Sequence, residues 1–238
     1  IPTSNFKICE SLNETIDYLK NSYFPLVIKA DGLASGKGVY ICKNFDDAKI
    51  ASEEIFNGKF GVAKQILVEE FLDGEEMSYF IVTDGKNYKF FGSAQDHKRV
   101  GEGDTGKNTG GMGCYSPSRL LSEDLELKIK TKIIEPTLNA INKSGGVYKG
   151  FLYVGLMIKN DEPFLIEFNV RMGDPECQTI LPTLNTDLFD VLISCCDGTL
   201  NQTIIDFSVS KSICIVLCSK GYPEKFENNI EIKDLEQI

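Results

Sequence analysis

A short apolar stretch near residue 170 carries polar side chains of types that bind metal ions. Side chains of an extended strand alternate between two faces, so Glu167, Asn169 and Arg171 are predicted to share one face. The opposite, buried face then holds Ile166, Phe168 and Val170. A carboxylate beside an amide oxygen suits Mg²⁺, which takes oxygen ligands and is usually shared with substrate phosphates. The alternative interpretation is a half-exposed edge strand whose polar face meets water.

The turn that follows this strand adds two more carboxylates. Gly173-Asp174-Pro175-Glu176 has the composition of a tight turn. With Glu167 and Arg171, its two acids place four ionisable side chains within ten residues. This crowding beside a strand favours a functional site over a solvated strand.

A glycine-rich loop near the start of the chain has the composition of a phosphate-binding loop. It spans residues 31–38, Asp-Gly-Leu-Ala-Ser-Gly-Lys-Gly, between the predicted strands Leu26–Ala30 and Val39–Cys42. It is not a Walker loop, because its glycine spacing differs, Gly38 replaces the Ser or Thr that binds Mg²⁺, and a strand follows it. A glycine-rich hairpin with backbone N–H groups over phosphates and Lys29 beneath them can bind phosphates by another route. The alternative is a flexible surface hairpin.

The acidic segment after the third predicted strand, Ile66-Leu67-Val68, has the groups that a nucleoside needs. Adenine requires one donor and one acceptor, which the Leu72 N–H and the Glu70 C=O can supply. Glu76 lies four residues beyond Leu72 and can accept hydrogen bonds from both ribose hydroxyls. The alternative is a solvated strand end that happens to be acidic.

The hydrophobic pattern predicts mixed strands and helices in the first part of the chain. Asn44 caps a helix whose first turn is acidic. A hairpin around Asp84-Gly85 joins the strands Ser78–Val82 and Tyr88–Phe91. These elements make a compact α+β unit of about 70 residues, with a hinge near Phe71–Gly74.

The second part of the chain begins with Gln95–Gly113, which is predicted to be a long polar loop because it is rich in glycine. Ser122 opens a helix that Pro136 should kink or interrupt. The remaining predicted elements are a hairpin of residues 151–158 and 164–168, a helix over 187–196 and a strand over 213–218.

Composition bounds the class of protein. With 238 residues, 42% of them hydrophobic, the chain can form one large or two smaller domains. A net charge of −10 argues against nucleic acid as a partner. The eight cysteines form no Cys-x-x-Cys pair, which indicates reduced thiols of a cytoplasmic protein. The sequence shows neither a membrane span nor a signal peptide, and its ends at Ile1 and Ile238 suggest a fragment.

Five segments together resemble the ATP-grasp superfamily and, within it, the phosphoribosylamine–glycine ligase family. They are residues 27–38, 69–76, 95–99, 108–113 and 167–176, and Gly221-Tyr222-Pro223 resembles the start of that family's C-terminal domain. The resemblance implies an α+β ATP-grasp fold, with the nucleotide between two α+β subdomains. The implied parts are a lid subdomain over 1–72, a core subdomain with the metal site over 73–207, and the start of a truncated C-terminal domain over 208–238.

The resemblance also implies the residues of the site, with ATP and Mg²⁺ or Mn²⁺ as cofactors. The implied metal ligands are Glu167 and Asn169, and the implied catalytic residues are Lys37, Arg171 and Asp174. The implied ATP-binding residues are Lys29, Gly36, Lys37, Glu69, Glu70, Leu72 and Glu76. The implied substrate-binding residues are Asp96, His97, Lys98, Gly110 and Gly111. For His97, a structural hydrogen-bonding role stays open beside a catalytic one.

The implied reaction is the ATP-driven joining of glycine to 5-phosphoribosylamine in purine synthesis. Glycine becomes glycyl phosphate, and the amine then displaces phosphate to give glycinamide ribonucleotide, ADP and phosphate. We expect small-molecule partners only, and a monomer or weak dimer. Two alternatives stay open, namely a nucleotide-binding ATP-grasp module without its own chemistry and a related ATP-grasp carboxylate ligase.

Two features depart from the family's pattern. Many superfamily members carry another metal-binding acid on the strand before Glu167, but Tyr153-Val154-Gly155-Leu156 contains none. The family's N-terminal domain and most of its C-terminal domain also have no counterpart in this sequence. We therefore expect metal binding to depend on Glu167 and Asn169 together with phosphates and water.

Overall fold

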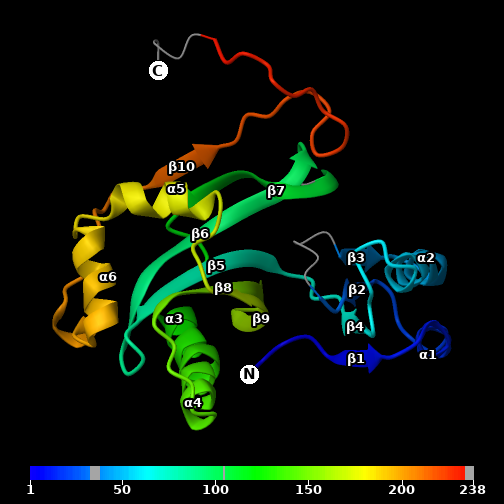
Figure 1. The fold of residues 1–238 in the computed structure, drawn as a ribbon, viewed down its shortest axis with the longest axis horizontal. Helices are drawn as coiled ribbons and strands as arrows, with labels where there is room; N and C mark the ends of the chain where they lie inside the picture. The colour runs from blue at the N-terminus through cyan, green and yellow to red at the C-terminus, as the bar shows by residue number, and fades with distance from the viewer. Residues whose placement is uncertain (33–37, 104, 234–238) are drawn as a thin grey trace. The chain divides into compact units, whose positions relative to one another are not determined.

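The computed structural model describes residues 1–32, 38–103 and 105–233 (Figure 1). The chain divides into two compact units. The first comprises Ile1–Glu75 with Phe164–Ile166, and the second comprises Glu76–Pro163 with Glu167–Ile238. The predicted divisions after residues 72 and 207 remain predictions.

The first unit is a four-stranded antiparallel sheet with two helices. Its strand order is β1-β4-β2-β3. The strands are β1 (Phe6–Cys9), β2 (Leu26–Ala30), β3 (Val39–Cys42) and β4 (Ile66–Glu70), and the helices are α1 (Leu12–Leu19) and α2 (Phe45–Phe56). Apolar side chains from the sheet and from both helices form one buried core.

Local capping explains where the two helices of the first unit begin. The Asp47 N–H donates to the Asn44 side chain over 2.9 Å, as predicted, and the Glu14 N–H donates to Ser11 over 3.2 Å. The predicted strands β2 and β3 are confirmed. Strand β1 and helix α1 were not predicted. Strand β1 lies at the sheet edge and its Phe6 is 56% exposed, so its sequence lacks the pattern of a buried strand.

The second unit is built on a six-stranded sheet of order β10-β7-β6-β5-β8-β9. Its strands are β5 (Glu75–Thr83), β6 (Tyr88–Gly101), β7 (Thr105–Ser116), β8 (Gly150–Lys159), β9 (Glu162–Asn169) and β10 (Ser212–Ile215). Its helices are α3 (Glu123–Ile129), α4 (Glu135–Lys143), α5 (Glu176–Ile180) and α6 (Leu188–Asp197). One buried core lies between the sheet and helices α5 and α6, and the Phe91 ring packs there against Phe151 and Phe207.

The predicted long loop Gln95–Gly113 is wrong. Residues 95–101 and 105–113 belong to β6 and β7, which pair as a long antiparallel hairpin. Glycine and polar residues indicate loops in general, but here Gly106 and Gly111 take φ angles of +83° and +126° inside an irregular ladder. Backbone pairing in this hairpin therefore does not require apolar side chains.

Other predicted elements of the second unit are confirmed. The helix that Ser122 caps is interrupted by a π-helical turn at Lys130–Ile134. This turn ends two residues before Pro136, which has no N–H to donate. The hairpin of β8 and β9 turns through Asn160 and Asp161, whose φ angles of 53° and 58° suit a two-residue turn. Strand β10 is shorter than predicted and ends at Ile215.

Candidate functional site

The predicted metal ligands lie at the end of β9, the last strand of the sheet. The Asn169 side-chain amide donates a 3.2 Å hydrogen bond to the Glu167 carboxylate, so the structure brings these two side chains together. The predicted burial is wrong. Strand β9 lies at the sheet edge, Glu167 is exposed, and Val170 lies beyond the strand and is 74% exposed. An edge position leaves both oxygen-bearing side chains open to a ligand.

The strand before Glu167 carries no acid at residues 153–156, and Gly155 of this segment lies against Glu167. A Cβ atom on Gly155 would lie 3.1 Å from Glu167 Cγ and 3.5 Å from the Tyr153 hydroxyl. A side chain at this position would therefore displace Glu167. Among the described residues, no three His, Cys, Asp or Glu side chains form a metal centre. Glu167 and Asn169 offer oxygen atoms only, which fits Mg²⁺ when phosphates and water complete its shell.

A buried acid that sequence reasoning left out of the site lies at the start of α5. Glu176 is 3% exposed, and the Ser78 hydroxyl donates to its carboxylate over 2.8 Å. The Ser78 and Tyr153 hydroxyls are 3.2 Å apart. The signals for this network were the crowded acids of the turn that contains Glu176 and a serine within the apolar strand 77–83. A buried carboxylate is costly without hydrogen bonds, so Ser78 stabilises it.

Two predicted substrate residues lie near this buried acid. Burial and the neighbouring charge of Glu176 raise the pKa of Asp96 to about 7. Its Oδ1 atom is buried and has no hydrogen-bond partner among the described residues. Lys98 Nζ lies 3.1 Å from the Glu76 carboxylate. Burial lowers the pKa of Lys98, but the Glu76 charge more than offsets burial and holds that pKa above its usual value.

Gly111 of the predicted pair Gly110-Gly111 lies against Asp96. A Cβ atom on Gly111 would lie 3.0 Å from Asp96 Oδ1 and 2.5 Å from Pro175 Cδ, so this close approach requires glycine. The predicted substrate residues Asp96 and Gly111 are thus neighbours. His97 is exposed, and its ring stacks on Tyr115 with centroids 6.0 Å apart.

Two predicted catalytic residues make only local contacts. The Arg171 guanidinium donates to the Met172 carbonyl oxygen over 2.8 Å, and Asp174 accepts a 2.6 Å hydrogen bond from Gln178. Both side chains are exposed. No described contact brings Arg171 or Asp174 to Glu167, and their roles stay predictions.

The first unit holds the predicted nucleotide residues of β2 and β4. Lys29 Nζ lies 2.7 Å from the Glu69 carboxylate, which also accepts from Ser4 over 3.1 Å. Both members of the pair are largely buried, with 22% and 13% of their side chains exposed. Glu70 is exposed and accepts from Asn5 over 2.8 Å, and Leu72 is half-buried beyond β4. Gly36 and Lys37 lie outside the described residues.

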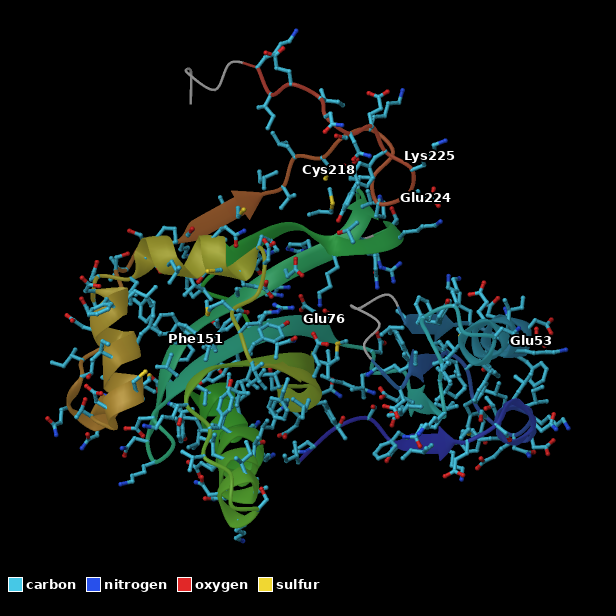
Figure 2. The ribbon with its side chains drawn as sticks, in the orientation of Figure 1. Glu53, Glu76, Phe151, Cys218, Glu224 and Lys225 are labelled. Atoms are coloured by element: carbon cyan, nitrogen blue, oxygen red, sulfur yellow. The ribbon has the colours of Figure 1, made fainter. Side chains whose placement is uncertain are left out.

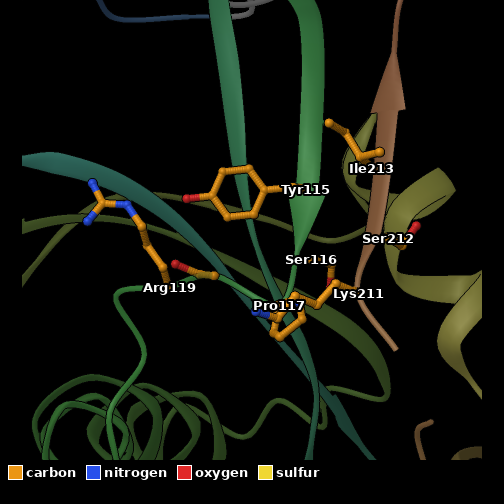
Figure 3. A pocket seen from close by; sticks show the side chains of 8 residues that line it. Tyr115, Ser116, Pro117, Arg119, Lys211, Ser212 and Ile213 are labelled. Carbon is orange, nitrogen blue, oxygen red and sulfur yellow. The ribbon is translucent and has the colours of Figure 1, made fainter. Parts of the chain in front are cut away.

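A pocket of about 410 Å³ lies beside the pairing of β7 and β10 (Figure 3). Its lining is Tyr115, Ser116, Pro117, Ser118, Arg119, Lys211, Ser212 and Ile213. None of the predicted site residues lines it. Its Tyr115 hydroxyl donates to Gln95, and the Ser118 hydroxyl donates to the same oxygen over 3.2 Å, so much of its polar surface is already engaged.

Neither a membrane span nor a disulfide is found in the described part of the chain. Its helices are all too short or too polar to cross a bilayer. All eight cysteines are free thiols.

Comparisons with known proteins identify the family of this chain. Residues 1–177 match the family model described as phosphoribosylglycinamide synthetase, ATP-grasp (A) domain. The phosphoribosylamine–glycine ligase of Haemophilus influenzae is 44% identical over 238 residues, which cover 99% of this chain and 56% of the relative. The chain therefore spans about half the length of this curated relative.

Solved structures of known proteins share the fold of this chain. The phosphoribosylamine–glycine ligase of Thermotoga maritima is similar with a TM-score of 0.87 and 35% identity, over 95% of this chain and 57% of that one. The ADP complex of purK, an N5-carboxyaminoimidazole ribonucleotide synthetase, shares the fold with a TM-score of 0.65 and 16% identity. That match covers 90% of this chain and 52% of the other.

Proposed function

This chain belongs to the phosphoribosylglycinamide synthetase ATP-grasp family and has the predicted α+β ATP-grasp fold, and we propose that it is the nucleotide- and substrate-binding part of a phosphoribosylamine–glycine ligase. The reaction joins glycine to 5-phosphoribosylamine at the expense of ATP and gives glycinamide ribonucleotide, ADP and phosphate. The observation that carries the proposal is the match of nearly the whole chain to ligases of this name.

ATP is the proposed nucleotide. The purK structure of the same fold is an ADP complex, which supports a nucleotide as the ligand here. Lys29 supplies a positive charge on β2 for phosphate oxygens, together with Lys37 of the glycine-rich loop. In the absence of nucleotide, Glu69 neutralises Lys29, and phosphate binding then replaces one anionic partner of the lysine by another.

Glu167 and Asn169 are the proposed ligands of Mg²⁺ or Mn²⁺. When bound, the ion neutralises charge on the transferred phosphoryl group and polarises it. The paired side chains at the strand end support this role, because they offer two oxygen ligands two residues apart. Arg171 and Asp174 are proposed catalytic residues, and their exposed side chains can rearrange around a bound phosphate.

The substrates bind, we infer, at Asp96, His97, Lys98, Gly110 and Gly111. The buried Asp96 oxygen without a partner supports this assignment, because an amine can supply the missing hydrogen bond. The pKa of Asp96, raised to about 7 by burial and by Glu176, suits a group that exchanges a proton with an amine near neutral pH.

The test is phosphate release by a full-length ligase that contains this chain. We expect phosphate release to require both glycine and 5-phosphoribosylamine, since the acyl phosphate must form before the amine attacks. A panel of other carboxylates and amines should give little turnover. ATP hydrolysis that is indifferent to glycine, or preference for another carboxylate, would contradict the proposal.

A nucleotide-binding module without chemistry is the second candidate. It is favoured by residues 153–156 on the strand before Glu167, which include no further acid for a metal ion. Activity that appears when the remaining ligase segments are supplied would contradict this candidate. We also propose that the protein is a monomer or weak dimer, which sedimentation of the protein tests. The eight free thiols support the proposal of a reducing, cytoplasmic location.

A further inference from the structure

The segment after β10 forms a strap beside the β6–β7 hairpin. We define the strap as residues 216–226; Figure 2 labels Cys218 and Glu224 on it, close to the hairpin end. Its start continues the pairing of β10 with β7, because the Val216 N–H donates to the Met112 carbonyl over 2.9 Å. Lys107 of the hairpin and Glu224 of the strap form an ion pair. The strap is thus attached to the hairpin at both ends.

A tight turn places the Tyr222 side chain in the middle of the strap. Gly221 has a φ of +99°, and a Cβ atom there would clash with the Lys225 carbonyl oxygen, so only glycine fits. The Tyr222 N–H donates to the Ser219 carbonyl over 3.2 Å. The Tyr222 ring packs edge-to-face on Phe226 with centroids 5.6 Å apart. The ring is therefore held while its hydroxyl faces the hairpin.

The hydroxyl of Tyr222 accepts a hydrogen bond from the Gly110 N–H over 3.2 Å. This N–H needs a partner outside the ladder, because the register between β6 and β7 shifts between His97 and Arg99. The next N–H in this bulge, that of Gly111, donates to the Thr109 hydroxyl over 3.0 Å, which in turn donates to the Lys98 carbonyl over 2.7 Å. Tyr222 is therefore one of two side chains that fix the bulge.

The bulge determines where Gly111 lies relative to Asp96. Gly111 is buried against Pro175 and Asp96, and Gly110 precedes it directly. A shift of Gly110 must move Gly111, because consecutive Cα atoms are joined by a rigid peptide unit. The hydrogen bond between Tyr222 and Gly110 therefore also restricts the position of Gly111 in the proposed substrate site.

We propose that Tyr222 is a positioning residue of the substrate site, whose hydroxyl holds the Gly110-Gly111 bulge against Asp96. The proposal rests on the proposed function, in which these residues bind a substrate. Tyr222 itself is not a catalytic residue. Its effect falls on the non-nucleotide substrates, because its hydrogen bond is made to Gly110, next to Gly111 and Asp96 of the proposed substrate site.

The first test is amide hydrogen exchange at Gly110 in the full 238-residue chain. Tyr222→Phe removes the acceptor but keeps the ring that packs on Phe226, so we expect Gly110 exchange to become about fivefold faster. Tyr23→Phe is the matched control, because Tyr23 is 95% exposed in the first unit, and it should leave Gly110 unchanged. Unchanged Gly110 exchange in Tyr222→Phe would overturn the proposal.

The second test is steady-state kinetics of the full-length ligase. With Tyr222→Phe we expect the KM of glycine or of 5-phosphoribosylamine to rise about fivefold, while kcat and the KM of ATP stay within about twofold. An equal rise of all three KM values, or no rise in any, would overturn the positioning role. Wild-type enzyme without ligase activity would instead contradict the proposed function, and the exchange test would still decide whether Tyr222 holds the bulge.

Discussion

The side-chain amide of Asn169 and the carboxylate of Glu167 are hydrogen-bonded over 3.2 Å at the end of an edge strand. Their position two residues apart on a strand puts both side chains on the same face. The edge of the sheet leaves them accessible, and Gly155 on the neighbouring strand leaves room for Glu167. The pair is thus accessible to solvent and contributes little to the core.

Substitution of Glu167 is expected to remove activity without unfolding the chain. Glu167→Gln keeps the shape and the contact with Asn169 but removes the charge that a divalent cation requires. We expect Mg²⁺-dependent phosphate release by the full-length ligase to fall about 100-fold or more, while Tm changes by about 2 °C or less. Phosphate release and thermal unfolding measure the two effects.

Glu162→Gln is the matched control on the same strand. Glu162 forms surface ion pairs with Lys128 and Lys132 at 3.0 and 2.6 Å, and solvent screens such exposed pairs, so they contribute little to stability. Activity should therefore stay near that of the wild type. Parallel losses of stability and activity in Glu167→Gln would indicate a structural role for β9 instead.

Lys29 and Glu69 permit a test that separates stability from nucleotide binding. Lys29→Met leaves the largely buried Glu69 without its cation, and we expect the free energy of unfolding to fall by roughly 1–3 kcal/mol. The double variant Lys29→Met/Glu69→Gln should recover most of that loss. ATP affinity, measured by titration calorimetry, should stay weak in both variants. Recovery of ATP binding in the double variant would show that Lys29 acts only through Glu69.

Asp96 is expected to make stability depend on pH. Because burial and Glu176 raise its pKa to about 7 in the folded state, the folded chain keeps a proton that the unfolded chain releases near pH 4. This group therefore lowers stability as pH rises between about 4 and 7. Asn cannot titrate, so the stability of Asp96→Asn relative to wild type should grow by about 2–4 kcal/mol over this range.

Urea unfolding of both proteins at several pH values measures this difference. Carboxylates far from Asp96 contribute equally to the stability of both proteins and cancel. A difference that does not change between pH 4 and 8 would mean that Asp96 has an ordinary pKa in the folded chain.

Gly111 is expected to tolerate no side chain. Gly111→Ala combines a φ of +126° with a Cβ atom 2.5 Å from Pro175 Cδ, so we expect a loss of roughly 2–4 kcal/mol in urea unfolding. Gly103→Ala is the control, because Gly103 also has a positive φ of +69° but open space around a Cβ atom. Its loss should be about 1 kcal/mol. Equal losses would show that the contact with Pro175 is not tight.

Features that depend on neighbours a few residues away could be predicted from the sequence. The strands Leu26–Ala30 and Val39–Cys42, the cap at Asn44 and the interruption before Pro136 are local, because alternation, capping and a missing N–H act within a few residues. The pairing of Glu167 with Asn169 is local for the same reason. The family resemblance added the identity of the ligands that such residues bind.

Burial and long-range partners were decided only by the tertiary structure. Ser78, which precedes Glu176 by 98 residues, donates the hydrogen bond that stabilises the buried Glu176 carboxylate. The Gly110 N–H donates to the hydroxyl of Tyr222, which lies 112 residues later. The sequence alone determined which chemical groups the candidate site contains and placed Lys29, Glu167 and Asn169 on strands, but it assigned the residues that β6 and β7 carry to a loop. The path of the chain decided which of those groups meet, because a hydrogen bond between distant segments depends on the packing of the whole sheet.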